Sequence, residues 1–352
     1  KWGLGNPGSD GVPNKQGFDE FFGYNCQRQA HTYYPPFLWK NEKRVCLNNK
    51  VLDPHLVKLD EGADPRDEAS YAKYTQNVYS NDTIFSELLQ FVDQNKKQPF
   101  FLMWTTPLPH VSLQAPERWV KYYVEKFGDE APYTGTAGYM PCRYPHATYA
   151  AMISYFDEQV GKLVDHLKKN GLYDNTVIIF TSDNGPTFNG GSDSPWFDSG
   201  GPFKSEYGWG KCFVHEGGIR VPAIISWPGH IKEGSETDHI SSFQDVMPTL
   251  ADIAGIVCPP TDGISFLPTL KGEKAKQKEH EYLYWEYPDP RIGLKAVRWG
   301  KWKGIITDIR KGNTVMELYD LDNDLQELHD VAVEHPDIVE KLQHYMDISH
   351  ET

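Results

Sequence analysis

A long run of helical periodicity between two apolar strand patterns is the feature that most restricts the fold. From about His146 to Lys169 apolar side chains recur at helical spacing, and Gly171 suits the end of a helix. Residues 100–104 before this stretch and 176–181 after it are short apolar runs typical of buried strands. A strand, a helix and a strand in this order predict a right-handed parallel crossover. We therefore expect an α/β fold with a large, mostly parallel sheet flanked by helices.

Short strand-like runs replace the longer helical and apolar segments from about residue 280 onward. Four short runs, 282–286, 293–298, 302–306 and 316–319, are typical of antiparallel strands, and a last helix is expected after Pro336. We interpret residues 280–352 as a smaller C-terminal α+β subdomain with an antiparallel sheet plus a helix. Residues 1–279 then form the larger α/β domain.

Composition and charge exclude several classes of protein. The 352 residues carry a net charge of -14, which argues against a nucleic-acid partner because a phosphate backbone needs a basic surface. No apolar run reaches the length of a membrane span, so none is expected. A chain this acidic must meet an anionic substrate with local positive charge rather than with its overall field.

Two oxygen-bearing side chains, Asp183 and Asn184, follow the apolar run that ends at residue 181. Such oxygen donors suit Ca²⁺ or Mg²⁺ rather than zinc. Parallel sheets bind ligands at the carboxyl ends of their strands, so we expect both residues at that edge, together with His110, which follows the earlier predicted strand. The alternative is an ordinary turn, because Asp-Asn-Gly is common turn chemistry.

Lys211 lies among glycines at positions 208, 210, 217 and 218, which allow a backbone to approach a ligand closely. The alternative interpretation is that Lys211 is an exposed surface lysine, as most lysines in proteins are. A lysine that contacts an anion, close in sequence to a cation site, indicates an enzyme that acts on a charged ester.

These segments resemble the sulfatase family, the formylglycine-dependent branch of the alkaline phosphatase superfamily, and in particular its polysaccharide sulfatases. The resemblance covers essentially the whole chain in the family's order. It extends to residues 1–5, 17–24, 107–116, 181–185, 211–223, 227–229, 262–265 and 317–321.

The resemblance implies roles for individual residues. Lys1 corresponds to the lysine that bridges formylglycine and sulfate, Lys211 to a lysine that contacts sulfate, and His110 to a histidine that protonates the leaving alcohol. Asp183 and Asn184 correspond to ligands of Ca²⁺, with Mg²⁺ as a second possibility. Gly3 stands where the best-known relatives carry histidine, which puts one partner of the formylglycine in doubt.

The family's first signature, Cys or Ser followed by x-Pro-x-Arg, does not occur in these residues. The resemblance therefore implies that the formylglycine nucleophile and two further metal-binding carboxylates belong to a missing N-terminal segment. On this interpretation the chain is an inactive fragment that needs that segment to complete its site. The resemblance also implies a periplasmic or secreted location.

Arg28 and His31 lie in an aromatic loop soon after Lys1. We expect them to select the substrate by hydrogen bonds to sugar hydroxyls, in a sulfated glycan of galactose or N-acetylgalactosamine. The alternative is a packed loop with a surface arginine. Two rival functions stay open: a phosphoryl-ester hydrolase of the same superfamily, and a non-catalytic fragment that binds sulfated glycans.

Overall fold

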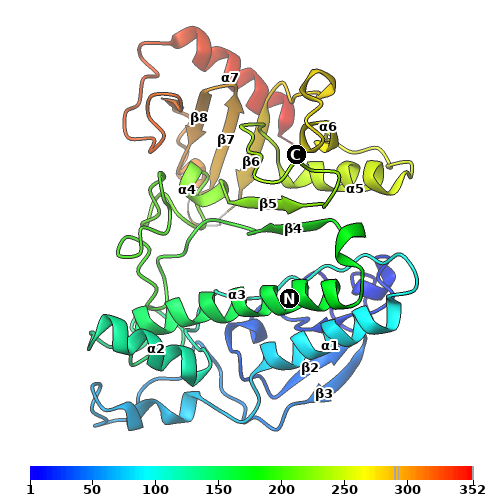
Figure 1. The fold of residues 1–352 in the computed structure, drawn as a ribbon. Coiled ribbons are helices and arrows are strands. Elements are labelled where there is room, and N and C mark those ends of the chain that lie inside the picture. Colours follow the sequence, from blue (N-terminus) through cyan, green and yellow to red (C-terminus); the bar gives the residue numbers. More distant parts are fainter. Residues whose placement is uncertain (289–290, 292, 351–352) are drawn as a thin grey trace. The chain divides into compact units, whose positions relative to one another are not determined.

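The computed structural model describes residues 1–288, 291 and 293–350, and the chain divides into two compact units. The first unit contains residues 1–172 and 187–193, and the second contains residues 173–186 and 194–352 (Figure 1). This division does not test the predicted domain boundary between residues 279 and 280, which stays a prediction.

The first unit contains a small antiparallel sheet. Its strands are β1 (Phe22–Gly23), β2 (Phe37–Lys40) and β3 (Lys43–Cys46), in that spatial order. β2 and β3 form a hairpin in which Phe37 is opposite Cys46. Tyr24, Ala30, Leu38 and Leu47 form a buried cluster beside this sheet.

Three helices complete the first unit: α1 (Ser80–Asn95), α2 (Glu117–Phe127) and α3 (Pro145–Lys169). α2 packs along α3, and α1 contacts both α3 and β1. The bounds of α3 confirm the helix predicted from about His146 to Lys169. Pro145 is suited to the first turn of a helix, where its missing N–H costs no hydrogen bond. Short 3₁₀ helices cover Pro13–Lys15, Gln29–His31 and Glu68–Tyr74.

The parallel crossover predicted around α3 is not present among the described residues. Residues 100–104 run without a strand partner, and Phe101 and Met103 are more than half exposed. The strand predicted after α3 does form, as β4 (Ile178–Thr181), but it pairs antiparallel with β5 (Ala223–Ser226). The prediction was wrong on this point because an apolar run specifies a strand-like segment but not its partner or direction.

The second unit begins with the β4–β5 pair, in which Ile178 is opposite Ser226. α4 (Glu216–Ile219) lies between these two strands in sequence, and α5 (Val246–Ala254) and α6 (Leu267–Leu270) follow β5. Gly255, which has a positive φ of 67°, ends α5 in the left-handed conformation that glycine adopts readily. Short 3₁₀ helices cover Tyr173–Asn175, Phe243–Asp245, Lys274–Lys276 and Ile309–Lys311.

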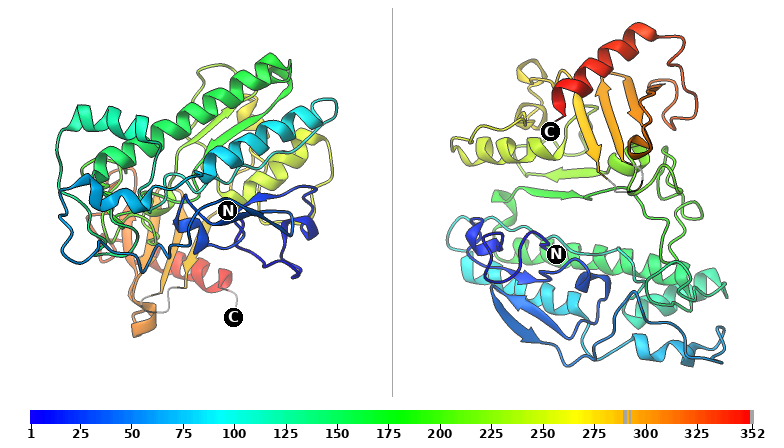
Figure 2. Two further views of the ribbon diagram at one scale, coloured as in Figure 1. Left: turned by 90° about the horizontal axis from the view of Figure 1, so that it is seen from below. Right: turned by 180° about the vertical axis from the view of Figure 1, so that it is seen from behind.

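The C-terminal part of the second unit is an antiparallel sheet of four strands in sequential order. The strands are β6 (Leu283–Tyr287), β7 (Leu294–Trp299), β8 (Trp302–Ile306) and β9 (Glu317–Asp320). Helix α7 (Pro336–Ser349) lies along one face of this sheet (Figure 2). The predicted C-terminal antiparallel sheet plus helix is therefore confirmed, and so is the α/β class. Within the described residues, we find no helix with the length and apolar character needed to cross a membrane.

Candidate active site

The segment that carries Lys1 is held in the first unit by backbone hydrogen bonds. The amides of Trp2 and Gly3 donate to the carbonyls of Tyr24 and Asn25, at 2.9 and 3.0 Å. The Thr105 hydroxyl donates to the carbonyl of Lys1 at 3.1 Å. Lys1 therefore lies beside Thr105, in the segment that leads to His110. Gly3 has a φ of +79°, a conformation that strains other residues, so the glycine found there fits its backbone.

One ring nitrogen of His110 forms a hydrogen bond with the backbone. Its Nδ1–H donates to the carbonyl oxygen of Val111, which can only accept. The His110 amide donates to Pro107 O at 2.8 Å, and the Tyr33 hydroxyl donates to the His110 carbonyl at 2.7 Å. Nδ1 therefore carries the bonded proton, and this bond fixes the orientation of the ring. This arrangement suits a general acid.

His31 lies against His110, as the prediction of a shared site requires. The two imidazole rings are stacked, with centroids 4.8 Å apart and planes 5° apart. The Tyr139 ring meets both of them edge-on, at 5.3 and 5.8 Å. His31 Nδ1 is also 2.7 Å from Nε2 of His55. We call His31, His55, His110 and Tyr139 the histidine cluster.

Arg28 is held by the segment that precedes His55. Its guanidinium pairs with the Asp53 carboxylate at 2.7 Å, and the other Asp53 oxygen accepts the His55 amide at 2.9 Å. That backbone hydrogen bond and the Arg28 side chain lower the pKa of Asp53. Residues 53–55 therefore contact both predicted substrate residues, Arg28 through Asp53 and His31 through His55.

The Asp183–Asn184 turn belongs to the second unit, directly after β4. The Gly185 amide donates to Gly218 O at 2.9 Å, and a Cβ on Gly185 would lie 1.8 Å from the carbonyl oxygen of Gly217. Only glycine allows this approach. Asn184 Nδ2 donates to Gly185 O at 2.9 Å, which leaves Asn184 Oδ1 for another partner.

The oxygen donors of this turn fit a hard cation. The Asp183 carboxylate is exposed, and among the described residues it enters no ion pair. Together with Asn184 Oδ1 it offers two of the oxygen ligands that Ca²⁺ or Mg²⁺ prefers. The described part of the chain contains no group of three or more His, Cys, Asp or Glu side chains placed to hold a metal. Two ligands from this turn therefore do not make a complete site.

The loop that carries Lys211 packs on the same turn. The Lys211 amide donates to Pro186 O at 2.9 Å, two residues past Asn184. A Cβ on Gly210 would lie 2.4 Å from Ser205 O, and one on Gly217 would lie 1.6 Å from Lys204 O. The absence of a side chain at Gly210 and Gly217 therefore allows these backbone segments to lie this close together. Lys211 is half-buried, and the structure gives its Nζ no ion pair with any described residue.

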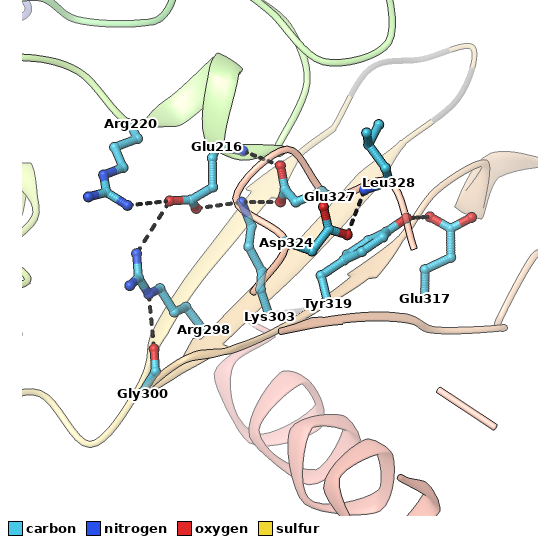
Figure 3. A network of polar contacts seen from close by, with 10 residues as sticks. All are labelled: Glu216, Arg220, Arg298, Gly300, Lys303, Glu317, Tyr319, Asp324, Glu327 and Leu328. Atoms are coloured by element: carbon cyan, nitrogen blue, oxygen red, sulfur yellow. Dashed lines mark hydrogen bonds and ion pairs between the residues drawn. The ribbon is translucent and has the colours of Figure 1, made fainter. Parts of the chain in front are cut away.

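A largely buried network of charged side chains joins α4 to the C-terminal sheet (Figure 3). Lys303, which is 0% exposed, has its Nζ 2.8 Å from Glu216 Oε1 and 2.9 Å from Glu327 Oε1. Arg298 and Arg220 each approach Glu216 Oε2 at 3.3 Å. We call these five residues the α4 charge network.

The pKa values of its two acids move in opposite directions. Burial alone would raise the pKa of Glu216, but Lys303 and the two arginines outweigh it and hold the pKa below its usual value. Burial raises the pKa of Glu327 although Lys303 opposes this.

His215, at the N-terminal end of α4, is a buried neutral residue. Burial lowers its pKa from the ordinary 6.5 to about 3, and the nearby charge of Lys303 adds to the effect. Its ring lies 5.4 Å from the ring of Trp209. It is therefore a packed core side chain at neutral pH, and we assign it no catalytic role.

This buried histidine should make the second unit sensitive to acid. Because the folded pKa lies below the unfolded one, the unfolded state binds more protons as pH falls from 6.5 toward 3, and stability is lost there. From pH 7 to pH 4 the loss should be about 3 kcal/mol. Urea unfolding at both pH values should show a smaller loss in His215→Gln than in the parent. Equal losses in the two proteins would contradict this assignment.

Comparison with known proteins identifies the family. Residues 1–256 match the model of the Sulfatase family, and residues 205–351 match the model described as N-sulphoglucosamine sulphohydrolase, C-terminal. The chain belongs to the sulfatase family.

Two similar proteins carry sulfatase names, and a solved structure shares the fold. An uncharacterized sulfatase of Schizosaccharomyces pombe is 27% identical, over 98% of this chain and 72% of its own length. The N-acetylgalactosamine-6-sulfatase of Homo sapiens is 29% identical, over 77% of this chain and 45% of its own. The crystal structure of Ps i-CgsB in complex with k-i-k-neocarrahexaose aligns with a TM-score of 0.70 at 26% identity, covering 96% of this chain and 67% of that one. The chain thus spans less than half of the human relative.

Sequence reasoning missed His55, Lys303 and Glu327. Nothing near His55 signals a site, because its neighbours read as an ordinary loop. Lys303 had a usable signal: it occurs in an apolar strand, two residues before Ile305, and so shares a buried face with it. A lysine in that position needs a buried acidic partner.

Proposed function

We propose that this chain forms part of an enzyme that hydrolyses sulfate esters on a carbohydrate. The observation that carries the proposal is the backbone contact of the Lys211 loop and the Asp183–Asn184 turn. Lys211 N reaches Pro186 O, and Gly185 N reaches Gly218 O. An exposed carboxylate and an amide oxygen are thereby close in the fold to a lysine without an ion pair among the described residues. This combination is suited to an anionic ester that is bound beside a cation.

Each residue has a distinct role in the proposal. Lys211 and Lys1 bind the sulfate oxygens and offset the charge that develops on them during the reaction. His110 donates a proton from Nε2 to the departing sugar oxygen, with its ring oriented by the bond from Nδ1–H to Val111 O. Asp183 and Asn184 hold Ca²⁺, or Mg²⁺, which when bound supplies further positive charge for the sulfate.

A sulfated galactose or N-acetylgalactosamine is the substrate that we propose. Support comes from the name of the human relative, N-acetylgalactosamine-6-sulfatase, and from the neocarrahexaose bound in the Ps i-CgsB complex. His31 is the residue proposed to bond a sugar hydroxyl, because its ring lies beside the proposed acid His110. Arg28 is proposed to act at the rim, where its exposed side chain pairs with the half-buried Asp53.

We further propose that residues outside these 352 complete the site. They would supply the formylglycine nucleophile and the remaining metal ligands, neither of which can be assigned to a residue of this sequence. A periplasmic or secreted location follows from the family resemblance and is part of the same proposal.

The test compares two proteins: the 352 residues alone, and a longer chain that carries a Cys-x-Pro-x-Arg segment matured to formylglycine. We expect the longer chain to release sulfate from an aryl sulfate and the 352 residues alone to release none, because nucleophile and metal ligands act as a unit. Turnover by the 352 residues alone would contradict the proposed division. A longer chain that binds sulfated glycans but never releases sulfate would favour the non-catalytic alternative.

A further inference from the structure

Two cations of the α4 charge network, Arg298 and Lys303, belong to one face of the C-terminal sheet. Side chains alternate between the two faces of a strand, and Val297, Ile306 and Leu318 pack toward α7. Leu294, Ala296, Ile305 and Tyr319 pack on the opposite face, together with Val214 from the loop before α4. Lys303 shares that second face, because it is two residues from Ile305 and is paired with Tyr319. The network therefore joins the C-terminal sheet to the segment that carries Glu216.

The network cannot be explained by the sheet alone. Arg298 and Lys303 are directly opposite each other on β7 and β8, and two cations in that position repel. Glu216 resolves the conflict, because one of its oxygens meets Lys303 and the other meets Arg298. The sheet thus presents a cationic pair that is stable only when a carboxylate from α4 lies between its members.

Glu327 holds the same helix by its backbone. Its Oε2 accepts the Glu216 amide at 2.7 Å, while its Oε1 is paired with Lys303 (Figure 3). Glu327 has a φ of +56°, a left-handed conformation that costs a non-glycine residue about 1 kcal/mol. Asp324 supports this turn by accepting the amides of Leu328 and His329, each at 2.8 Å. A strained residue persists where surrounding contacts fix it, and such residues cluster at functional sites.

The helix held in this way supports both halves of the candidate site in the second unit. Gly218 of α4 accepts the amide of Gly185, next to Asp183 and Asn184. Gly217 is in backbone contact with Lys204 O, at the start of the loop that carries Lys211. Any displacement of Glu216 would therefore move the metal-binding turn and the lysine loop together.

We propose that Lys303 is a positioning residue that fixes Glu216, and through α4 sets the placement of Lys211 and of the Asp183–Asn184 turn. This inference depends on the proposed function only for what those residues do. It gives the C-terminal sheet a part in the active site although none of its residues is assigned to touch the substrate. Removing the cation leaves two buried carboxylates facing each other, which is strongly unfavourable.

The test is hydrogen exchange, measured by mass spectrometry on the 352-residue chain. In Lys303→Met, peptides that cover residues 181–186 and 204–218 should exchange about tenfold faster than in the parent. Peptides from α7, on the other face of the sheet, should change much less. The matched control is Lys301→Met, which removes a partly buried ion pair with Asp320 next to the same strand and should change neither region.

If Lys303→Met does not fold, the double variant Lys303→Met/Glu327→Gln replaces it, because it removes one carboxylate together with the cation. It should keep the α7 protection of the parent and still exchange faster in residues 204–218. Parent-like exchange in that loop, or equal acceleration in the loop and α7, would overturn the positioning role. Failure of a completed enzyme to release sulfate would count against the proposed function alone, since exchange does not depend on turnover.

Discussion

Replacing Lys211 with alanine in the completed enzyme should lower kcat by about 10²–10³-fold, the cost of removing one oxyanion-stabilising group. The free energy of unfolding should change by less than about 0.5 kcal/mol, because the side chain forms no ion pair with the described residues. Sulfate release from an aryl sulfate gives the first quantity, and urea unfolding gives the second.

The matched control for this prediction is Lys232→Ala, which removes an exposed lysine elsewhere in the same unit. It should alter neither quantity. A Lys211→Ala enzyme with near-parental kcat would remove Lys211 from the site. A variant that loses activity only because it unfolds would make the lysine structural.

Replacing His31 with alanine should lower kcat/KM on a sulfated galacto-sugar by at least about 100-fold more than on a small aryl sulfate. A site built to hydrogen-bond a hydroxyl strongly rejects a substrate in which that bond cannot form. The aryl sulfate has no such hydroxyl, so its kcat/KM depends only on the other residues of the site, including His110. Initial rates on the two substrates give the comparison.

His166→Ala is the matched control, because His166 in α3 pairs with Asp93 and has no proposed role in substrate binding. It should leave the ratio of the two kcat/KM values unchanged. An equal loss on both substrates in His31→Ala would contradict the specificity role. His31 would then act through its stacked partner His110 or through the fold.

Local patterns in the sequence were sufficient to predict the elements that local forces determine. The helical spacing of apolar side chains predicted α3, and four short runs typical of antiparallel strands predicted the C-terminal sheet. The Asp-Asn-Gly turn and the glycines around Lys211 were also recognisable, because their backbone needs glycine wherever the chain lies. Such features depend on a few neighbouring residues and are readable from them.

Nonlocal pairing was not predictable in the same way. Residues 100–104 and β4 both read as buried strands, yet only β4 has a strand partner, and that partner is antiparallel. The contact between His31 and His55 joins residues 24 apart in sequence, and that between Lys303 and Glu216 joins residues 87 apart. No periodicity connects such positions, so these parts of the site became visible only in the folded chain.

The most direct test of the sulfatase assignment is the release of sulfate and of phosphate from matched p-nitrophenyl esters by the completed enzyme. Ion chromatography identifies the released anion, and the nitrophenol absorbance gives the rate. The account predicts sulfate as the favoured product, with a rate that falls when Lys211 or His110 is replaced. Phosphate release that exceeds sulfate release and depends on the same two residues would identify a phosphoryl hydrolase and contradict the account.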